Sequence, residues 1–237
     1  MKDLKSFINK RKSCRDYIML SLDENILEDI KQHIKTIKPL YENIKTEVKF
    51  DTLKNLKGRF MIKAPHYIVF YSENKPEYLV NAGFILEQLG LYLTSIGLGC
   101  CFLGLTKPKE QKDKELQFII TMAFGNSKDS PYRAANEFKR KNMETITDFN
   151  DKVLESVRLA PSAMNGQPWF FEKVDAGYNV YCTQHGVIKA ALLGDLNKID
   201  IGIALSHLYV CHDNFKFVYN KEVLNKSGYK YMGTVSI

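Results

Sequence analysis

Residues 160–169 read Ala-Pro-Ser-Ala-Met-Asn-Gly-Gln-Pro-Trp, and they hold two prolines, one glycine and the only tryptophan of the chain. An apolar helical pattern ends just before this stretch and a strand-like run starts at its last residue, so we expect a loop between a helix and a strand. Pro161 and Pro168 fix their own φ and favour extended backbone at Ala160 and Gln167, whereas Gly166 permits a positive φ. Such a loop is either a preorganised binding site or a turn that only reverses the chain.

The composition is that of an ordinary globular protein. With 237 residues, of which 45% are hydrophobic and 26% charged, the chain can form one large domain or two small ones. Glu87 and Gln88 interrupt the best candidate for a membrane span before it reaches the roughly 18–20 residues that a span needs. The charged N-terminus lacks the apolar segment of a signal peptide. We therefore expect a cytoplasmic protein with no membrane partner.

Neither the cysteines nor the net charge identifies a partner by itself. The five cysteines form no CxxC or metal-ligand spacing, so we expect reduced thiols and no metal site. The net charge of +7 is compatible with nucleic-acid binding, but the basic residues are concentrated only in 10–15 and 139–141. No helix-turn-helix, zinc-finger or RNP-type signature accompanies them, so we expect no nucleic-acid partner. A phosphate on a small molecule suits clusters this compact.

Hydrophobic periodicity predicts alternating helices and strands. The pattern over 23–37 is that of an amphipathic helix, which Ser21 or Asp23 can cap. Residues 77–98 are apolar nearly all round, as in a buried helix, and a glycine turn follows up to residue 104. The other expected elements are short helices within 2–13, 110–115 and 153–159, strands at 67–71, 118–124, 169–174, 178–182 and 215–219, and a second buried helix through 200–208.

The order helix, strand, buried helix, strand occurs twice, once in each half of the chain. Glycine and leucines fall in register when residues 81–89 are set against 200–208, although the identity between the halves is weak. We expect an α+β fold of two repeats, 1–147 and 148–237, each with a mixed, mainly antiparallel sheet and a buried central helix. Together the repeats would form one compact unit like the two subunits of a two-fold dimer.

Residues 11–15, Arg-Lys-Ser-Cys-Arg, carry candidate binding chemistry. Two guanidinium groups can bind a phosphate bidentately, and the serine hydroxyl can donate to the same oxygens. The alternative interpretation is the solvated basic end of a helix. The five histidines are scattered, no serine lies in a GxSxG context, and His207 on an apolar helix fits a core position. A phosphate-binding segment without an acid–base pair favours a cofactor as the carrier of the chemistry.

Four segments resemble the FMN-dependent nitroreductase family. Residues 11–17 resemble its N-terminal R-x-S-x-R/K segment, and residues 160–169 closely match its A-P-S-S-x-N-x-Q-P-W loop, which is its most specific motif. Residues 83–104 are similar to its central helix and glycine turn, and residues 139–144 to its late basic segment. Together these resemblances cover nearly the whole chain.

The order of the motifs resembles a fused form of the family's homodimer, whose flavins lie between subunits. In single-repeat members the loop follows soon after the R-x-S-x-R segment, whereas here it lies in the second half of the chain. The resemblance therefore implies an intrachain pseudo-dimer, monomeric or weakly dimeric, with one FMN at the junction of the halves. It assigns the phosphate to Arg11, Lys12, Ser13, Arg15 and Arg140, the N5 side of the ring to Leu103 and Gly104, and the isoalloxazine to Pro161, Ser162, Ala163 and Asn165.

The resemblance also implies an activity. In an oxidoreductase of this kind, NAD(P)H reduces FMN and leaves, and a nitroaromatic, quinone or related small-molecule acceptor then takes the electrons in a ping-pong cycle. No protein acid or base is needed for that scheme. The alternatives are a family member with other flavin chemistry, such as dehalogenation or flavin breakdown, and a non-catalytic flavin carrier.

Overall fold

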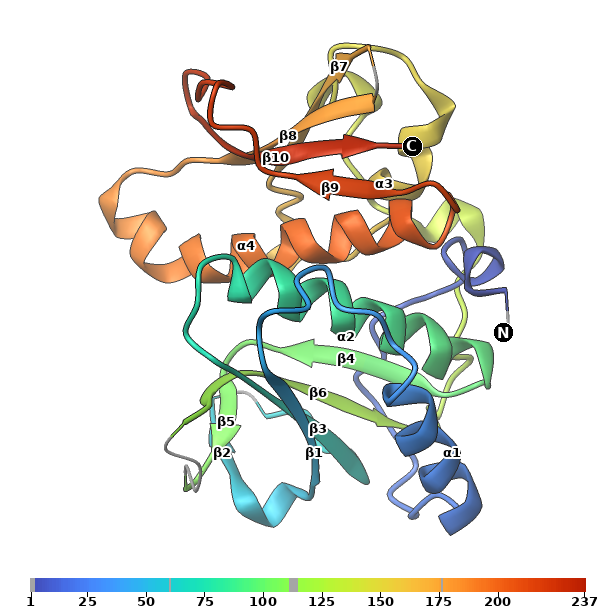
Figure 1. The fold of residues 1–237 in the computed structure, drawn as a ribbon. Helices are drawn as coiled ribbons and strands as arrows, with labels where there is room; N and C mark the ends of the chain where they lie inside the picture. The colour runs from blue at the N-terminus through green and yellow to red at the C-terminus, as the bar shows by residue number, and fades with distance from the viewer. Residues whose placement is uncertain (1–2, 60, 111–114, 176) are drawn as a thin grey trace. The chain divides into compact units, whose positions relative to one another are not determined.

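The structure is a computed structural model in which the chain folds as two compact units. The residues that it describes are 3–59, 61–110, 115–175 and 177–237. The first unit consists of Met1–Tyr78 and Ile85–Glu137, and the second of Leu79–Phe84 and Phe138–Ile237. Each unit is built on a four-stranded antiparallel sheet (Figure 1). The expected α+β class with antiparallel sheets is confirmed.

The sheet of the first unit has the order β1-β3-β6-β4. β3 (His66–Ser72) and β6 (Gln117–Gly125) form its centre, while β1 (Thr46–Asp51) and β4 (Gly99–Leu103) form its edges. The aromatic and β-branched side chains in the middle of β3 are fully buried, which suits an inner strand. The two central strands confirm the sequence prediction. The glycine turn expected up to residue 104 is wrong from Gly99 onward, because that segment pairs with β6 as a strand.

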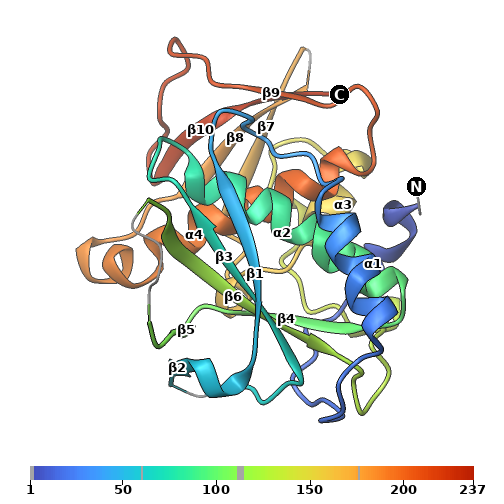
Figure 2. The same ribbon diagram turned by 60° about the horizontal axis from the view of Figure 1, so that its bottom comes forward.

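Two helices belong wholly or largely to the first unit. α1 (Glu24–Ile34) begins where the Asp23 carboxylate accepts a hydrogen bond from the Asn25 backbone at 2.8 Å, so the expected amphipathic helix and its Asp23 cap are confirmed. α2 (Tyr78–Ser95) ends before Gly97, whose φ of 82° turns the chain out of the helix. From Ile85 onward α2 runs across one face of the first sheet (Figure 2).

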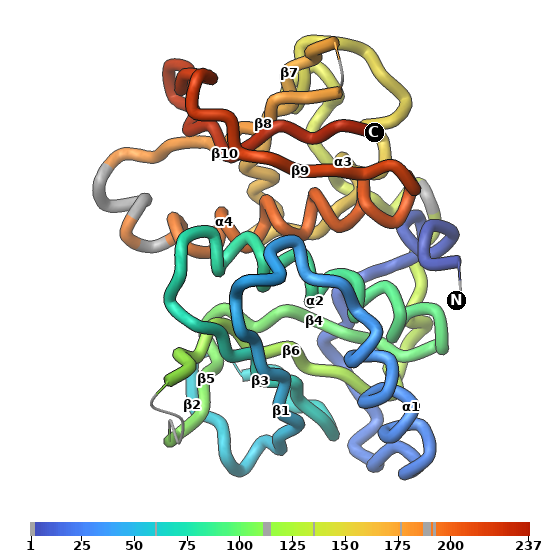
Figure 3. The backbone as a smooth tube through the Cα atoms, viewed as in Figure 1, coloured from blue at the N-terminus to red at the C-terminus, as the bar shows by residue number. Residues whose placement is uncertain are grey.

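The sheet of the second unit has the order β7-β8-β10-β9. The hairpin of β7 (Trp169–Val174) and β8 (Gly177–Thr183) was expected from the sequence, as was β9 (Lys216–Val218). β10 (Tyr229–Ser236) was not expected from the sequence. It inserts between β8 and β9 and is the last strand along the chain in Figure 3. Because β10 lies between β8 and β9, the second sheet is complete only when this last strand has paired with both of them.

The long helix of the second unit, α4 (Val187–Tyr209), crosses the first turns of α2 at two glycines. A Cβ atom on Gly83 would lie 2.0 Å from the Ile199 carbonyl oxygen, and one on Gly202 would lie 1.9 Å from the Val80 carbonyl oxygen. Only glycine allows two helix backbones to approach this closely. The expected buried helix through 200–208 is confirmed, and it begins earlier in the chain than the periodicity predicted.

No helix in the described part of the chain is both long and apolar enough to cross a membrane. Several short elements complete the fold. The helix expected within 2–13 is a single 3-10 turn, and the short helix expected at 110–115 lies mostly outside the described residues. The short elements are η1 (Leu4–Phe7), η2 (Leu53–Asn55), β2 (Leu56–Gly58), β5 (Thr106–Pro108), η3 (Ala135–Glu137), η4 (Met143–Thr145), η5 (Lys152–Leu154), α3 (Glu155–Arg158) and η6 (Ala163–Asn165).

Candidate functional site

The loop at 160–169 has a strained backbone in the second unit. Met164, Asn165 and Gln167 have φ values of 51°, 56° and 44°, a region that costs a residue with a side chain about 1–3 kcal/mol. Gly166, by contrast, has a φ of −70°. The expectation of an extended Gln167 is therefore wrong, and Gly166 does not adopt the positive φ that it permits. The strain falls on three residues with side chains, and it persists because surrounding groups hold them.

Asn165 is one of the residues that fix this conformation. Its Oδ1 accepts a hydrogen bond from Arg140 Nη1 at 2.9 Å, and its Nδ2 donates to the Lys139 carbonyl at 2.8 Å. Arg140 also donates from Nη2 to the Leu159 carbonyl at 3.1 Å, at the start of the loop. The late basic segment and the loop, which the sequence separated, thus meet in one hydrogen-bonded cluster.

Gln167 has a structural role that the sequence analysis missed. Its side chain is buried, its backbone N–H donates to Ser162 Oγ at 2.9 Å, and its Oε1 accepts from the Lys141 backbone at 2.8 Å. Lys141 Nζ in turn donates to the Gln167 carbonyl at 3.1 Å. These bonds tie the end of the loop to both its beginning and the basic segment, which offsets the strain at Gln167.

Asp200, on α4, supports the loop from below. Both of its carboxylate oxygens accept from the Ala163 backbone N–H, at 3.0 and 3.1 Å. Burial raises the pKa of Asp200 to about 8, and the hydrogen bond from Ala163 only partly opposes that shift. The sequence analysis did not select Asp200, because an acidic residue within an apolar helix carries no motif. Its contact with the loop, which lies earlier in the chain, depends on the tertiary structure.

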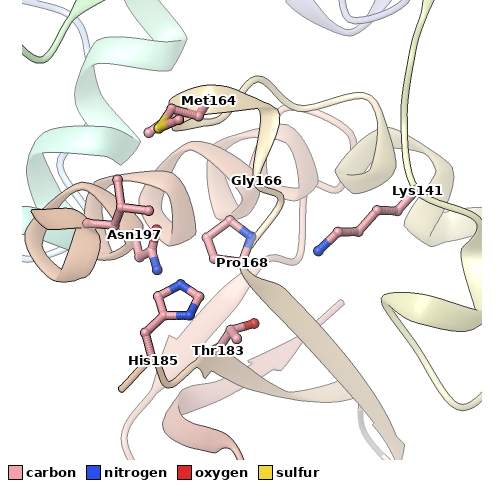
Figure 4. Close-up of a pocket in the computed structure, with 9 residues that line it drawn as sticks. Lys141, Met164, Gly166, Pro168, Thr183, His185 and Asn197 are labelled. Carbon is pink, nitrogen blue, oxygen red and sulfur yellow. The ribbon is translucent and has the colours of Figure 1, made fainter. Parts of the chain in front are cut away.

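A pocket of about 420 Å³ opens beside the loop, within the second unit (Figure 4). Met164, Gly166 and Pro168 form the loop side of this pocket, and Lys141 reaches toward it from the basic segment. The end of β8 and the first half of α4 close the other side. Of the loop residues predicted to bind flavin, Ala163 also lines the pocket.

The basic segment of the first unit, residues 11–15, runs alongside β4. The Cys14 backbone N–H donates to the Cys100 carbonyl at 3.0 Å, and Ser13 pairs with Cys100 as a parallel bridge. The same strand leads to Leu103, which is buried, and to Gly104, which is exposed. Two parts of the predicted site, the R-x-S-x-R segment and the end of β4, are thus adjacent elements of one unit.

Arg11 is not a solvated basic residue. Its side chain is only 3% exposed, its Nε lies 3.1 Å from Glu87 Oε1, and its guanidinium lies 5.7 Å from the centre of the Phe102 ring. Nη1 donates to Ser13 Oγ at 3.5 Å, whereas Nη2 is buried and has no hydrogen-bond partner in the described part of the chain. That orphaned donor fits an acceptor oxygen such as one of a phosphate.

Arg15 and Arg133 flank this buried arginine. Arg15 is exposed and donates from Nη1 to the Ser13 carbonyl at 3.4 Å. Lys12, which follows Arg11 in the chain, is half-buried. The pKa of Arg133 is lowered, first by burial and then by the positive charge of Arg11, with a further contribution from Arg15. Arg133 was missed because a single arginine in a polar stretch has no motif; the bridge between Arg11 and Tyr132 brings it to the cluster.

The predicted site residues are divided between the two units. Those of the first unit are Arg11, Lys12, Ser13, Arg15, Leu103 and Gly104. Those of the second unit are Arg140, Pro161, Ser162, Ala163 and Asn165. Within each unit they lie on neighbouring segments, and their binding of FMN stays a prediction.

The fold defines the class of protein: an α+β protein of two four-stranded antiparallel sheets and long apolar helices. The family model described as "Putative TM nitroreductase" matches residues 3–212. The chain therefore belongs to this nitroreductase family. No curated protein sequence matches it.

One solved structure shows the same fold, and two others are reported with it as more distant similarities. A "putative nitroreductase" from Thermotoga maritima is 23% identical, with coverage of 92% of this chain and 90% of that chain and a TM-score of 0.64. A nitroreductase family protein from Clostridium difficile 630 is 16% identical over 61% of this chain and 96% of its own, with a TM-score of 0.49. A nitroreductase with bound FMN from Desulfitobacterium hafniense DCB-2 is 14% identical over 60% of this chain and 100% of its own, with a TM-score of 0.43.

Proposed function

We propose that this protein binds one FMN per chain and is an NAD(P)H-dependent oxidoreductase of nitroreductase type. The observation that carries the proposal is the loop at 160–169. In a member of the nitroreductase family, the segment that matches the flavin motif holds three side-chain-bearing residues at positive φ. Backbone strain of this kind is concentrated at functional sites, where the surrounding structure keeps a binding surface preorganised.

The phosphate end of FMN is assigned to the first unit. Ser13 and Arg15 offer a hydroxyl and an exposed guanidinium, and Arg11 offers the buried Nη2 donor described above. To these we add Arg133, because the charges of Arg11 and Arg15 act on it. A dianionic phosphate would relieve the mutual repulsion of three arginines, which is the physical reason to expect tight binding there.

The isoalloxazine end is assigned to the loop of the second unit. Pro161, Ser162, Ala163 and Asn165 would orient the ring, and Arg140 supports them by holding Asn165. When bound, FMN supplies the electron transfer from NAD(P)H to a nitroaromatic, quinone or related acceptor, in two successive half-reactions. The residues of the chain would bind and orient the cofactor.

Titration of the purified full-length protein with FMN tests the proposal. We expect one bound flavin per chain with a perturbed visible spectrum, followed by bleaching when NADH or NADPH is added without oxygen. Absence of flavin binding at micromolar concentrations overturns the proposal. Binding without reduction by either nucleotide overturns the enzymatic part and leaves the flavin-carrier alternative.

A further inference from the structure

The pocket beside the loop at 160–169 is lined by both polar and apolar side chains. Thr183, His185 and Asn197 provide polar groups, and Met164, Pro168 and Leu193 provide an apolar surface. In Figure 4 the Asn197 and His185 side chains lie near each other across from Lys141, with Pro168 between them. A cavity of about 420 Å³ is within the size range of pockets that bind small molecules, roughly 300–1,000 Å³.

The charge of the pocket favours an anion. Lys141 contributes an ammonium group, and no acidic side chain is among the described residues that line the pocket. Asp200 lies one helical turn after Asn197 on α4, but its carboxylate faces the Ala163 backbone. A negatively charged ligand would therefore meet a positive charge in a partly enclosed space, where Coulombic attraction is stronger than in water.

Asn197 provides an independent indication of a ligand. The residue is 5% exposed, and its Nδ2 has no hydrogen-bond partner in the described part of the chain. A buried amide donor without a partner costs about 1–3 kcal/mol, so a ligand oxygen that accepted its proton would recover that cost. A lysine ammonium and an amide donor that face each other across a partly apolar pocket match a carboxylate lying between them and attached to a compact apolar body.

Two features prepare the pocket for such a ligand. The bonds of Lys141 to Gln167 hold the lysine in place, so that little side-chain freedom is lost when an anion binds. Met164 is 87% exposed at the opening, and its unbranched thioether side chain can adapt to apolar groups of different shape. The first feature favours affinity, and the second favours tolerance in the apolar part of the ligand.

We propose that this pocket is a binding site for small monocarboxylates with a compact apolar body, such as an arylacetate. The Lys141 ammonium and the Asn197 amide would bind the carboxylate, and Met164, Pro168 and Leu193 would contact the body. All of these residues belong to the second unit, and the inference does not require that the protein bind flavin. It goes beyond the proposed oxidoreductase activity.

Calorimetric titration of the full-length protein with phenylacetate, without added flavin, tests the charge requirement. We expect phenylacetate to bind, and phenylacetamide, which has nearly the same shape without the charge, to bind at least about tenfold more weakly. Lys141→Met should weaken phenylacetate binding by about tenfold or more, whereas Lys216→Met, an exposed lysine of the same unit, should leave it unchanged. Failure of phenylacetate to bind, or equal binding of the amide, overturns the proposal.

Asn197→Asp provides a second test that does not depend on the Lys141 variant folding. The substitution keeps the side-chain shape but replaces the amide donor by a carboxylate. We expect phenylacetate binding to fall by about tenfold or more and binding of 2-phenylethylammonium to increase. If Asn197→Asp binds phenylacetate as tightly as the unsubstituted protein does, Asn197 does not contact the ligand and the proposal is wrong.

Discussion

Gly83 and Gly202 make reciprocal contacts: the Cα of each lies against the helix that carries the other. Gly83 faces the Ile199 carbonyl, and Gly202 faces the Val80 carbonyl. On each helix, the residue whose carbonyl is contacted precedes the glycine by the same number of positions. A contact in which residue i meets j while the equivalent of j meets the equivalent of i is the pattern found across a two-fold axis. It supports the prediction that the halves arose by duplication, which stays a prediction.

Substitution of either glycine should therefore destabilise the protein equally. A Cβ about 2 Å from a carbonyl oxygen forces the helices apart, so we expect Gly83→Ala and Gly202→Ala each to lower the free energy of unfolding by at least about 2 kcal/mol. Gly194→Ala is the control, because nothing lies within 4 Å of the added atom. It should raise stability by about 0.5–1 kcal/mol. Denaturant unfolding measures all three, and a tolerated Gly83→Ala would contradict the close crossing.

Replacing only one partner of the Arg11–Glu87 ion pair should strongly reduce the stability of the protein. Both side chains are almost fully buried, so Glu87→Gln leaves an uncompensated charge and should cost about 3–5 kcal/mol of folding free energy. Replacing both partners, as Arg11→Met with Glu87→Leu, should cost less than Glu87→Gln alone. Glu47→Gln, at the partly exposed pair with Lys49, is the control and should cost about 0–1 kcal/mol. A double variant less stable than Glu87→Gln would show that the pair is a net stabiliser.

Asp200 should make stability depend on pH. Its pKa rises from an ordinary 3.8 to about 8 in the folded protein, so between these values the folded state holds a proton that the unfolded state has lost. The free energy of unfolding should therefore decrease as pH rises from about 4 to about 8, by at most about 1.4 kcal/mol per pH unit, and level off above.

Asp200→Asn should remove that slope, because asparagine does not titrate. Denaturant unfolding between pH 5 and pH 9 compares the variant with the unsubstituted protein, and Asp213→Asn, an exposed acid, serves as control. The stability difference between the protein and Asp200→Asn should shift with pH, while that for Asp213→Asn should stay constant. The same slope in Asp200→Asn would assign the pH dependence to other groups.

Arg133 should matter for FMN but not for riboflavin. If its guanidinium binds the phosphate, Arg133→Ala should weaken FMN binding by about tenfold or more. That change in affinity corresponds to the loss of one charge-assisted hydrogen bond. Riboflavin lacks the phosphate, so its affinity should not change. Arg59→Ala, an exposed arginine of the same unit, is the matched control. Equal losses for both flavins would remove Arg133 from the phosphate site without affecting the other assignments.

Local patterns predicted the elements that their own residues specify. The Asp23 cap, the aromatic run of β3 and the hairpin that starts at Trp169 all follow from period, capping and turn residues. β4 was missed because glycine next to cysteine has low strand propensity, and only its pairing with β6 makes it a strand. β10 was missed because most of its pairing is with β8, which lies before α4 and β9 in the chain.

The candidate site was predictable as a set of motifs but not as a set of contacts. The sequence could assign Asn165 to the loop, yet its bonds to Lys139 and Arg140 depend on tertiary structure. Likewise, Gly166 is the residue that a local rule selects for positive φ, but the hydrogen bonds of Asn165 and Gln167 impose that conformation on them instead. Propensity gives way where a network of partners over-determines the backbone.

Met164 stands apart from the network that shapes its loop. Its backbone is held at positive φ by bonds that its neighbours make, while its side chain is 87% exposed at the mouth of the pocket. The bonds that shape the loop therefore do not depend on the Met164 side chain. If the pocket binds a small molecule as proposed, a substitution at position 164 would change the contacts offered to that ligand while the bonds that shape the loop stay in place.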